Sequence, residues 1–190
     1  LEMGGKNPMI VLDDADLDAA VNCAVQSGFF STGQRCTASS RLIVTEGIHD
    51  RFIAAMVEKM KALRIDDARK AGTDIGPVVD PSQLAQDLDH IGIAQAEGGR
   101  LLQGGEALAT NVDGQPGYFL TPALITETLP AMRINREEVF GPVVSVIRAK
   151  DYDEALAIAN DSPFGLSSGI ATTSLKHATH FKRHAQAGMV

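Results

Sequence analysis

Apolar and polar positions along the chain follow two periods, which predict strands and helices in turn. Short apolar runs typical of buried strands alternate with longer stretches whose apolar residues recur at helical spacing. The predicted strands are residues 8–12, 41–46, 100–105, 118–125, 141–149 and 167–174, and the predicted helices are 14–25, 48–63, 83–97, 151–160 and 175–185. This alternation indicates an α/β fold, with a mostly parallel, twisted sheet, right-handed crossovers and helices on both faces.

Local signals refine these elements. Asp14 is predicted to cap the first helix, whose apolar positions run from Leu17 to Val25. Residues 71–82 contain several glycines and prolines and are predicted to be a loop. Pro122 lies inside the predicted strand 118–125 and indicates an edge or irregular strand, because proline has no N–H for the ladder.

Composition narrows the class of protein. With 190 residues, 44% of them apolar, the chain is long enough for one domain with a buried core. The net charge of −7 argues against nucleic acid as the main partner. No apolar run approaches the roughly 20 residues of a membrane-spanning helix, so no membrane partner is expected. Two cysteines are too few for a disulfide framework, which makes a reducing, cytoplasmic setting the expectation.

The two cysteines occur in different surroundings. Cys23 lies within the first predicted helix, and we expect it to be a small core side chain. Cys36 follows Gly33, which should prevent the preceding helix from continuing to the cysteine, and precedes the polar stretch TASS. A thiol in a loop beside the guanidinium of Arg35 should hold more of the nucleophilic thiolate form. A reactive role for Cys36 and an unreactive one are both open on this evidence.

Two further strings contain acidic residues next to glycine. Glu2 precedes Gly4 and Gly5 in LEMGGKNP, where the glycines allow backbone to approach a ligand closely. Glu138 precedes Phe140 in REEVFGPV, at a Gly-Pro turn. Each carboxylate could equally be a solvated side chain, so neither string indicates a function alone.

Taken in order, these strings resemble one family. LEMGGK, FFSTGQRC with its cysteine 34 residues after Glu2, and EEVFGPV about a hundred residues further on are similar to motifs of the aldehyde dehydrogenase superfamily. NDSPFGLSSGI, at residues 160–170, resembles a downstream segment of the same family. The resemblance covers essentially the whole chain, and it implies the catalytic domain of the aldehyde dehydrogenase fold.

The resemblance implies a role for individual residues. Cys36 would be the nucleophile and Glu2 the general base, and the backbone N–H of Cys36 would supply part of an oxyanion hole. Glu138 would bind the ribose hydroxyls of a nicotinamide cofactor, NAD or NADP, with Phe140 beside the ribose. Met3 is a further implied cofactor contact, and Phe30 an implied substrate contact. The reaction would oxidise an aldehyde to a carboxylic acid through a thiohemiacetal and a thioester, and no metal is required.

The same resemblance implies that residues 1–190 are a single catalytic domain cut from a longer protein. The dinucleotide-binding domain would lie upstream and a C-terminal segment downstream. We therefore expect the isolated piece to fold but to turn over aldehyde poorly or not at all. The full-length protein is expected to be a homo-oligomer.

The substrate is less defined than the reaction. The strings around Cys36, Glu138 and residues 167–183 most resemble the branch of the family that oxidises 2-oxoglutarate semialdehyde. Arg35 could pair with a substrate carboxylate in a bidentate manner, or it could be a structural arginine that bonds backbone carbonyls or an interface carboxylate. Succinate semialdehyde and simple aliphatic aldehydes remain alternative substrates.

Two functions of other classes also remain open. Cys36 could be a hydrolase nucleophile paired with one of the five histidines, which are His49, His90, His177, His180 and His184. The last three share one face of the predicted final helix, where metal binding and a solvated face are both conceivable. The second function of another class is a non-catalytic assembly domain with an unused thiol.

Overall fold

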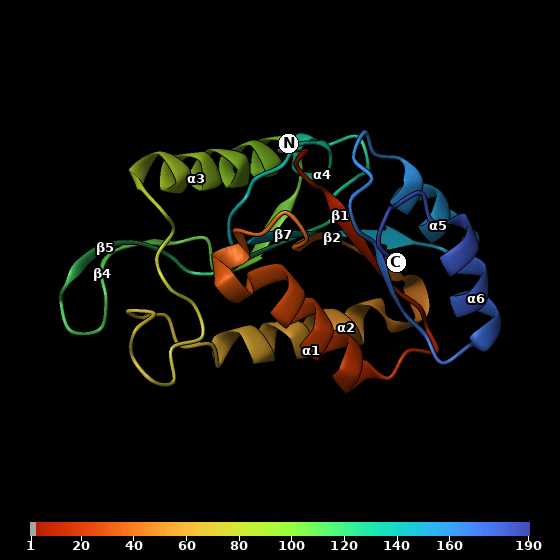
Figure 1. Cartoon of the computed structure of the whole chain (residues 1–190), viewed down its shortest axis with the longest axis horizontal. Helices are drawn as coiled ribbons and strands as arrows, with labels where there is room; N and C mark the ends of the chain where they lie inside the picture. Colours follow the sequence, from red (N-terminus) through yellow and green to blue (C-terminus); the bar gives the residue numbers. More distant parts are fainter. Residues whose placement is uncertain (1–2) are drawn as a thin grey trace.

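A six-stranded sheet is the centre of the computed structural model, which describes residues 3–190 (Figure 1). Its strands lie in the order β3-β6-β7-β2-β1-β8. They are β3 (Arg100–Gln103), β6 (Ala123–Thr126), β7 (Val143–Ala149), β2 (Ser39–Thr45), β1 (Asn7–Val11) and β8 (Gly169–Ala171). Only β3 runs antiparallel to its neighbour, and the other pairings are parallel. The predicted mostly parallel sheet is therefore confirmed.

Helices cover both faces of this sheet, as the alternating pattern predicts (Figure 1). On one face lie α1 (Leu17–Phe29) and α2 (Glu46–Lys61), and on the other lie α3 (Pro81–Ala96), the short α4 (Arg133–Arg136), α5 (Tyr152–Asn160) and α6 (Leu175–His184). Along β7, Val144 and Val146 join the core under α1 and α2, whereas Val143 and Ile147 join the cores on the opposite face. The central strands are thus apolar on both sides, as parallel strands between two helix layers must be.

The structure corrects the predicted strand 118–125. The segment forms two strands, β5 (Pro116–Leu120) and β6, with Thr121 and Pro122 between them. β5 pairs with β4 (Ala107–Thr110), a strand that the sequence pattern did not reveal, in a separate two-stranded hairpin. Because Pro122 cannot donate to a ladder, the chain changes sheets at this point.

Two predictions on the first helix are wrong. Its N-cap is Asp16, whose side chain accepts from the backbone N–H of Ala19, while the carboxylate of Asp14 instead accepts from the hydroxyls of Thr172 and Thr173. Cys23 is exposed rather than part of the core.

Among residues 3–190, no helix has both the length and the apolar character to cross a membrane.

Candidate active site

Cys36 follows a turn with unusual backbone conformation. After α1, the 3-10 turn η1 (Phe30–Gly33) places Ser31 (φ 56°), Thr32 (φ 59°) and Gly33 (φ 64°) in succession in the left-handed region. A side chain disfavours this region, most of all a β-branched one such as that of Thr32, and strain of this kind concentrates at functional sites. A Cβ at Gly33 would overlap the carbonyl group of Gly141, so only glycine fits there. The turn presents an exposed Cys36 just before β2.

The backbone of the cysteine loop is held by a buried amide. Asn7, at the start of β1, donates from Nδ2 to the carbonyl oxygens of Cys36 and Ala38, each at 2.8 Å, and its Oδ1 accepts from the N–H of Ser167 at 3.1 Å. Gly5 lies directly against the carbonyl oxygen of Cys36, where a Cβ would not fit. The sequence analysis missed Asn7, although it directly follows Lys6 in the string that contains the glycine pair.

Glu138 approaches the same place from the other side. Its half-buried carboxylate accepts from the backbone N–H of Gly5 at 2.7 Å. Phe140 is 37% exposed and also has left-handed backbone, with φ 61°. A narrow pocket lies between these segments and is lined by Gly5, Gly28, Gly33, Arg35, Ala38, Ser40, Glu138, Val139, Phe140, Gly141 and Val143. The structure thus brings together the glycine pair, the cysteine loop and the Glu138 turn, which are far apart in the sequence.

All three segments enter the sheet at the same edge. The glycine pair precedes β1, the cysteine loop precedes β2, and the Glu138 turn precedes β7, and these strands are parallel neighbours. The candidate site therefore lies at the amino ends of the strands, whereas open α/β sheets usually bind ligands at the carboxyl ends.

Not every residue implied by the family resemblance can be placed in this site. Glu2 lies outside the residues that the structure describes. Met3 is 70% exposed. Phe30 is half-buried and packs against the core under α1 and α2. The roles of these residues, and those of Cys36, Glu138 and Phe140, stay predictions.

Arg35 has a structural partner. Its Nη2 donates to the carbonyl oxygens of Gln26 and Ser27, at 3.1 and 2.9 Å, in the last turn of α1. The Gln26 carbonyl also accepts from the backbone N–H of Phe30, so the guanidinium adds to the hydrogen bonds that close the end of α1. These bonds correspond to the structural alternative considered for Arg35, rather than to a free site for a substrate carboxylate.

A buried cation lies next to the glycine pair. Lys6 is 1% exposed, and burial together with the nearby charge of Arg41 lowers its pKa to about 7, although Glu138 acts in the opposite direction. Its Nζ has no hydrogen-bond partner within residues 3–190. Arg41 is itself buried and donates to the carbonyl oxygens of Lys6, Ile158 and Ala159. Neither of these buried cations was anticipated from the sequence.

The histidines have partners away from Cys36. His49 bonds Asp50, and His90 bonds Glu137 and the carbonyl of Gln86. On α6, His177 stacks on Tyr152, the Tyr152 hydroxyl bonds His180, and His180 stacks on His184. Within the described part of the chain, no group of three or more His, Cys, Asp or Glu side chains is arranged to hold a metal ion. These contacts give no support to a thiol–imidazole hydrolase.

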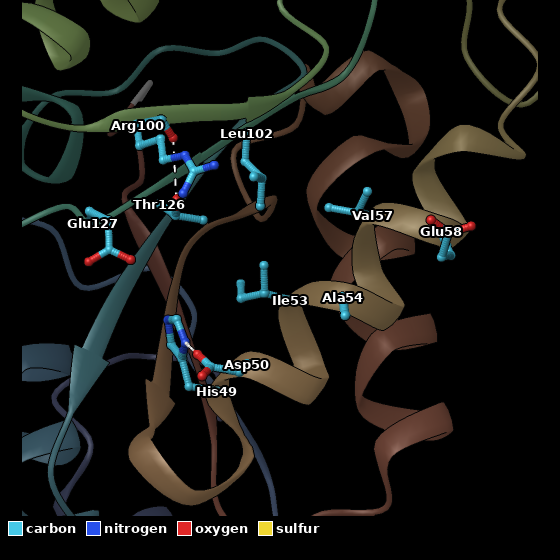
Figure 2. Close-up of a pocket in the computed structure, with 10 residues that line it drawn as sticks. All are labelled: His49, Asp50, Ile53, Ala54, Val57, Glu58, Arg100, Leu102, Thr126 and Glu127. Atoms are coloured by element: carbon cyan, nitrogen blue, oxygen red, sulfur yellow. Dashed lines mark hydrogen bonds and ion pairs between the residues drawn. The ribbon is translucent and has the colours of Figure 1, made fainter.

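A larger hollow lies elsewhere on the molecule. A cavity of about 440 Å³ lies between α2 and the strands β3 and β6, and Figure 2 shows the residues that line it. Ile53, Val57 and Leu102 form its apolar lining, and Arg100, Asp50 and Glu58 are among the charged residues that border it. Apart from His49, a candidate in the hydrolase alternative, it contains none of the predicted site residues, so size alone does not identify the reactive site in this fold.

Comparison with known proteins shows similarity along the whole chain. The sequence profile described as "Aldehyde dehydrogenase family" covers residues 1–190. The chain is 44% identical over its whole length to the alpha-ketoglutaric semialdehyde dehydrogenase of Bacillus subtilis, of which it covers 39%. It is 40% identical over 99% of its length to a betaine aldehyde dehydrogenase of Cereibacter sphaeroides, of which it covers 38%.

The fold has close counterparts among solved structures. The betaine aldehyde dehydrogenase of Staphylococcus aureus in complex with NAD+ superposes with a TM-score of 0.96 at 36% identity, over 100% of this chain and 38% of that one. A Thermus 1-pyrroline-5-carboxylate dehydrogenase with bound NAD gives a TM-score of 0.91 at 38% identity, over 98% of this chain and 35% of that one. The chain spans about two fifths of the length of such relatives. With the family profile across its full length and this fold, the chain belongs to the aldehyde dehydrogenase family.

Proposed function

We propose that the protein containing this chain oxidises an aldehyde to a carboxylic acid with NAD or NADP, and that Cys36 is the nucleophile. The observation that carries the proposal is the exposed Cys36, presented by a strained turn whose backbone is fixed against Gly5 and, through Gly5, Glu138. The thiolate adds to the aldehyde carbon to give a thiohemiacetal, whose oxyanion accepts from the backbone N–H of Cys36. Loss of hydride from the same carbon leaves a thioester on Cys36.

Glu138 is suited to contact the cofactor. One of its carboxylate oxygens accepts from Gly5 N–H, and the carboxylate retains further acceptor capacity, which suits the paired hydroxyls of a ribose. The exposed ring of Phe140 adds an apolar surface beside it. A nicotinamide cofactor held by Glu138 and Phe140 would supply the acceptor for the hydride.

Water then hydrolyses the thioester. A carboxylate near the sulfur takes a proton from the attacking water as the C–S bond breaks and the thiolate leaves. We assign this general base to Glu2, only three residues before Gly5. The products are a carboxylic acid, a reduced cofactor and free Cys36.

We propose 2-oxoglutarate semialdehyde as the substrate. Two relatives at 44% and 43% identity, from Bacillus subtilis and Haloferax volcanii, are named for alpha-ketoglutaric or alpha-ketoglutarate semialdehyde, which is the same compound. Betaine aldehyde dehydrogenases at about 40% identity make a cationic aldehyde the principal alternative. The values of kcat/KM for the semialdehyde, betaine aldehyde, succinate semialdehyde and propanal distinguish these cases, and equal values would refute an acid preference.

We further propose that residues 1–190 are the nucleophile-bearing domain of a homo-oligomeric protein whose main cofactor-binding region lies in another part of the chain. The share of each relative that is covered, about 39%, supports this division. On its own, this domain is expected to show little or no reduction of NAD or NADP.

Substitution of the two cysteines tests the proposal. In the intact enzyme, Cys36→Ala should reduce kcat by at least a thousandfold, because no other group replaces the covalent step. Cys23→Ala is the matched control, since Cys23 is also exposed but lies on α1 away from the loop, and it should leave kcat unchanged. Full activity of the Cys36→Ala variant would refute the assignment.

A further inference from the structure

We propose that Asp87 of α3 is a positioning residue for the turn that contains Glu138 and Phe140. The inference rests on the proposed function, because that turn is taken as the cofactor-binding one. Asp87 is buried, faces the turn and belongs to none of the motifs noticed in the sequence.

Hydrogen bonds join Asp87 to one side of the turn. Its Oδ1 accepts from Nε2 of Gln83 at 2.8 Å, and the same Nε2 donates to the carbonyl oxygen of Val139 at 2.9 Å. Gln86, on the next turn of α3, also donates to the Val139 carbonyl, at 2.8 Å. The carboxyl group of Asp87 therefore fixes the amide that holds the backbone between Glu138 and Phe140.

Direct packing joins Asp87 to the other side of the turn. The carboxyl group lies so close to the backbone of Gly141 that a Cβ there would overlap both of its oxygens. The carbonyl group of Gly141 in turn lies against Gly33, which also has no room for a Cβ. Asp87 thus packs directly against the Glu138 turn, and the far side of that turn lies against the loop that presents Cys36.

Burial favours the neutral form of the Asp87 carboxyl. Asp87 Oδ2 has no partner in the described residues, and burial raises the pKa of this carboxyl to about 7. The two acidic residues of the turn have other partners: Glu137 pairs with Arg133 and His90, and Glu138 accepts from Gly5. A neutral carboxyl can be imitated by a carboxamide, which retains the oxygen that accepts from Gln83.

The test uses three variants of the intact enzyme with NAD or NADP. Asp87→Leu keeps the branched shape but removes the acceptor for Gln83, Asp87→Asn retains the acceptor, and Asp89→Asn, on the exposed side of α3, is the matched control. We expect Asp87→Leu to raise the KM for the cofactor about five- to tenfold with kcat changed less than threefold, because binding in the ground state and the transition state is weakened alike. Asp87→Asn should restore the KM to within twofold of the wild type.

Each other outcome has a defined meaning. A cofactor KM in Asp87→Leu equal to that of Asp89→Asn would overturn the proposal, as would failure of Asp87→Asn to restore it. If both Asp87 variants lose their native near-ultraviolet circular dichroism, Asp87 serves folding alone and the proposal is also overturned. Absence of NAD- or NADP-dependent oxidation in the wild-type enzyme would instead refute the proposed function.

Discussion

The amide of Asn7 joins three segments that form the site: the start of β1, the cysteine loop and the chain before β8. Its two N–H groups and its oxygen are all used, and the residue is buried. A buried polar group that loses its partner costs about 1–3 kcal/mol. At the residue scale, the presentation of Cys36 thus depends on a side chain that performs no chemistry itself.

Replacement of Asn7 should separate these segments. Asn7→Ala leaves the carbonyls of Cys36 and Ala38 and the N–H of Ser167 without their partner, so we expect a loss of about 2–4 kcal/mol in the free energy of unfolding and at least a tenfold lower kcat. Asn7→Asp should be worse, because a carboxylate cannot donate to the two carbonyls. Thermal unfolding and steady-state kinetics of the intact enzyme measure both effects. Asn22→Ala, on α1, serves as the control, and a wild-type kcat in Asn7→Ala would contradict this role.

Single residues were predicted from the sequence with mixed success. Cys36 and Glu138 stood out because their strings are distinctive, and the structure brings their loops together. Cys23 was misjudged because membership of an amphipathic helix was taken as burial. Ala20, Val21, Ala24 and Val25 define the buried side of α1, and at 100° per residue Cys23 falls outside it. Asn7, Lys6 and Asp87 were missed because a buried polar role depends on contacts that local sequence does not contain.

At the scale of elements, the long loop between α2 and α3 supports the cysteine loop. Thr32 donates to the carbonyl of Gly76 at 3.3 Å, and the N–H of Val79 donates to the side chain of Gln34 at 3.1 Å. The loop is held in place by Asp66, whose fully buried side chain bonds Arg64, Lys70 and the N–H of Asp67. Lys70 also pairs with Asp113 in the β4–β5 hairpin. An ion-pair network thus fixes a segment that has little regular structure of its own.

The pH dependence of stability should show this network. Burial acts to raise the pKa of Asp66, but the bonds from Asp67 N–H and Lys70 outweigh it, so its pKa is lowered. A lowered carboxyl pKa stabilises the fold above the ordinary value near 4, and this stabilisation is lost as the pH falls through the folded-state pKa. Asp66→Asn should therefore have a lower melting temperature than the wild type at pH 7. The difference in melting temperature should become smaller as the pH falls below about 4.

The control for that series is Asp89→Asn, whose side chain is exposed on α3. Its melting temperature should follow the wild type across the same pH range. If the difference in melting temperature between Asp66→Asn and the wild type is the same at pH 7 and at pH 3, this result would contradict an ionised, paired Asp66.

The helices and central strands followed from periodicity, because each has an apolar face or core to bury. Shorter elements did not. η1 and α4 are each four residues long, and β4 is largely exposed, so none carries a clear apolar period. The break between β5 and β6 depends on which sheet each strand joins, and Pro122 indicated only that the region was irregular.

At the scale of the whole molecule, the site forms where three loops meet at the amino ends of β1, β2 and β7. The alternation of elements predicted a parallel sheet. It did not predict the strand order, the antiparallel β3 or the location of the site at the amino ends of the strands. Those features arise from contacts between distant segments. Both the exposed Cys36 and the Glu138 turn lie at this edge of the sheet.

The most direct test of the central claim is to trap the covalent intermediate. The intact enzyme is mixed with 2-oxoglutarate semialdehyde and NAD or NADP, quenched in acid within one turnover, digested and mapped by mass spectrometry. The account predicts an acyl group in thioester linkage on Cys36 and none on Cys23, with formation of one equivalent of reduced cofactor. Product formation with an unmodified Cys36 at every time within the first turnover would contradict it.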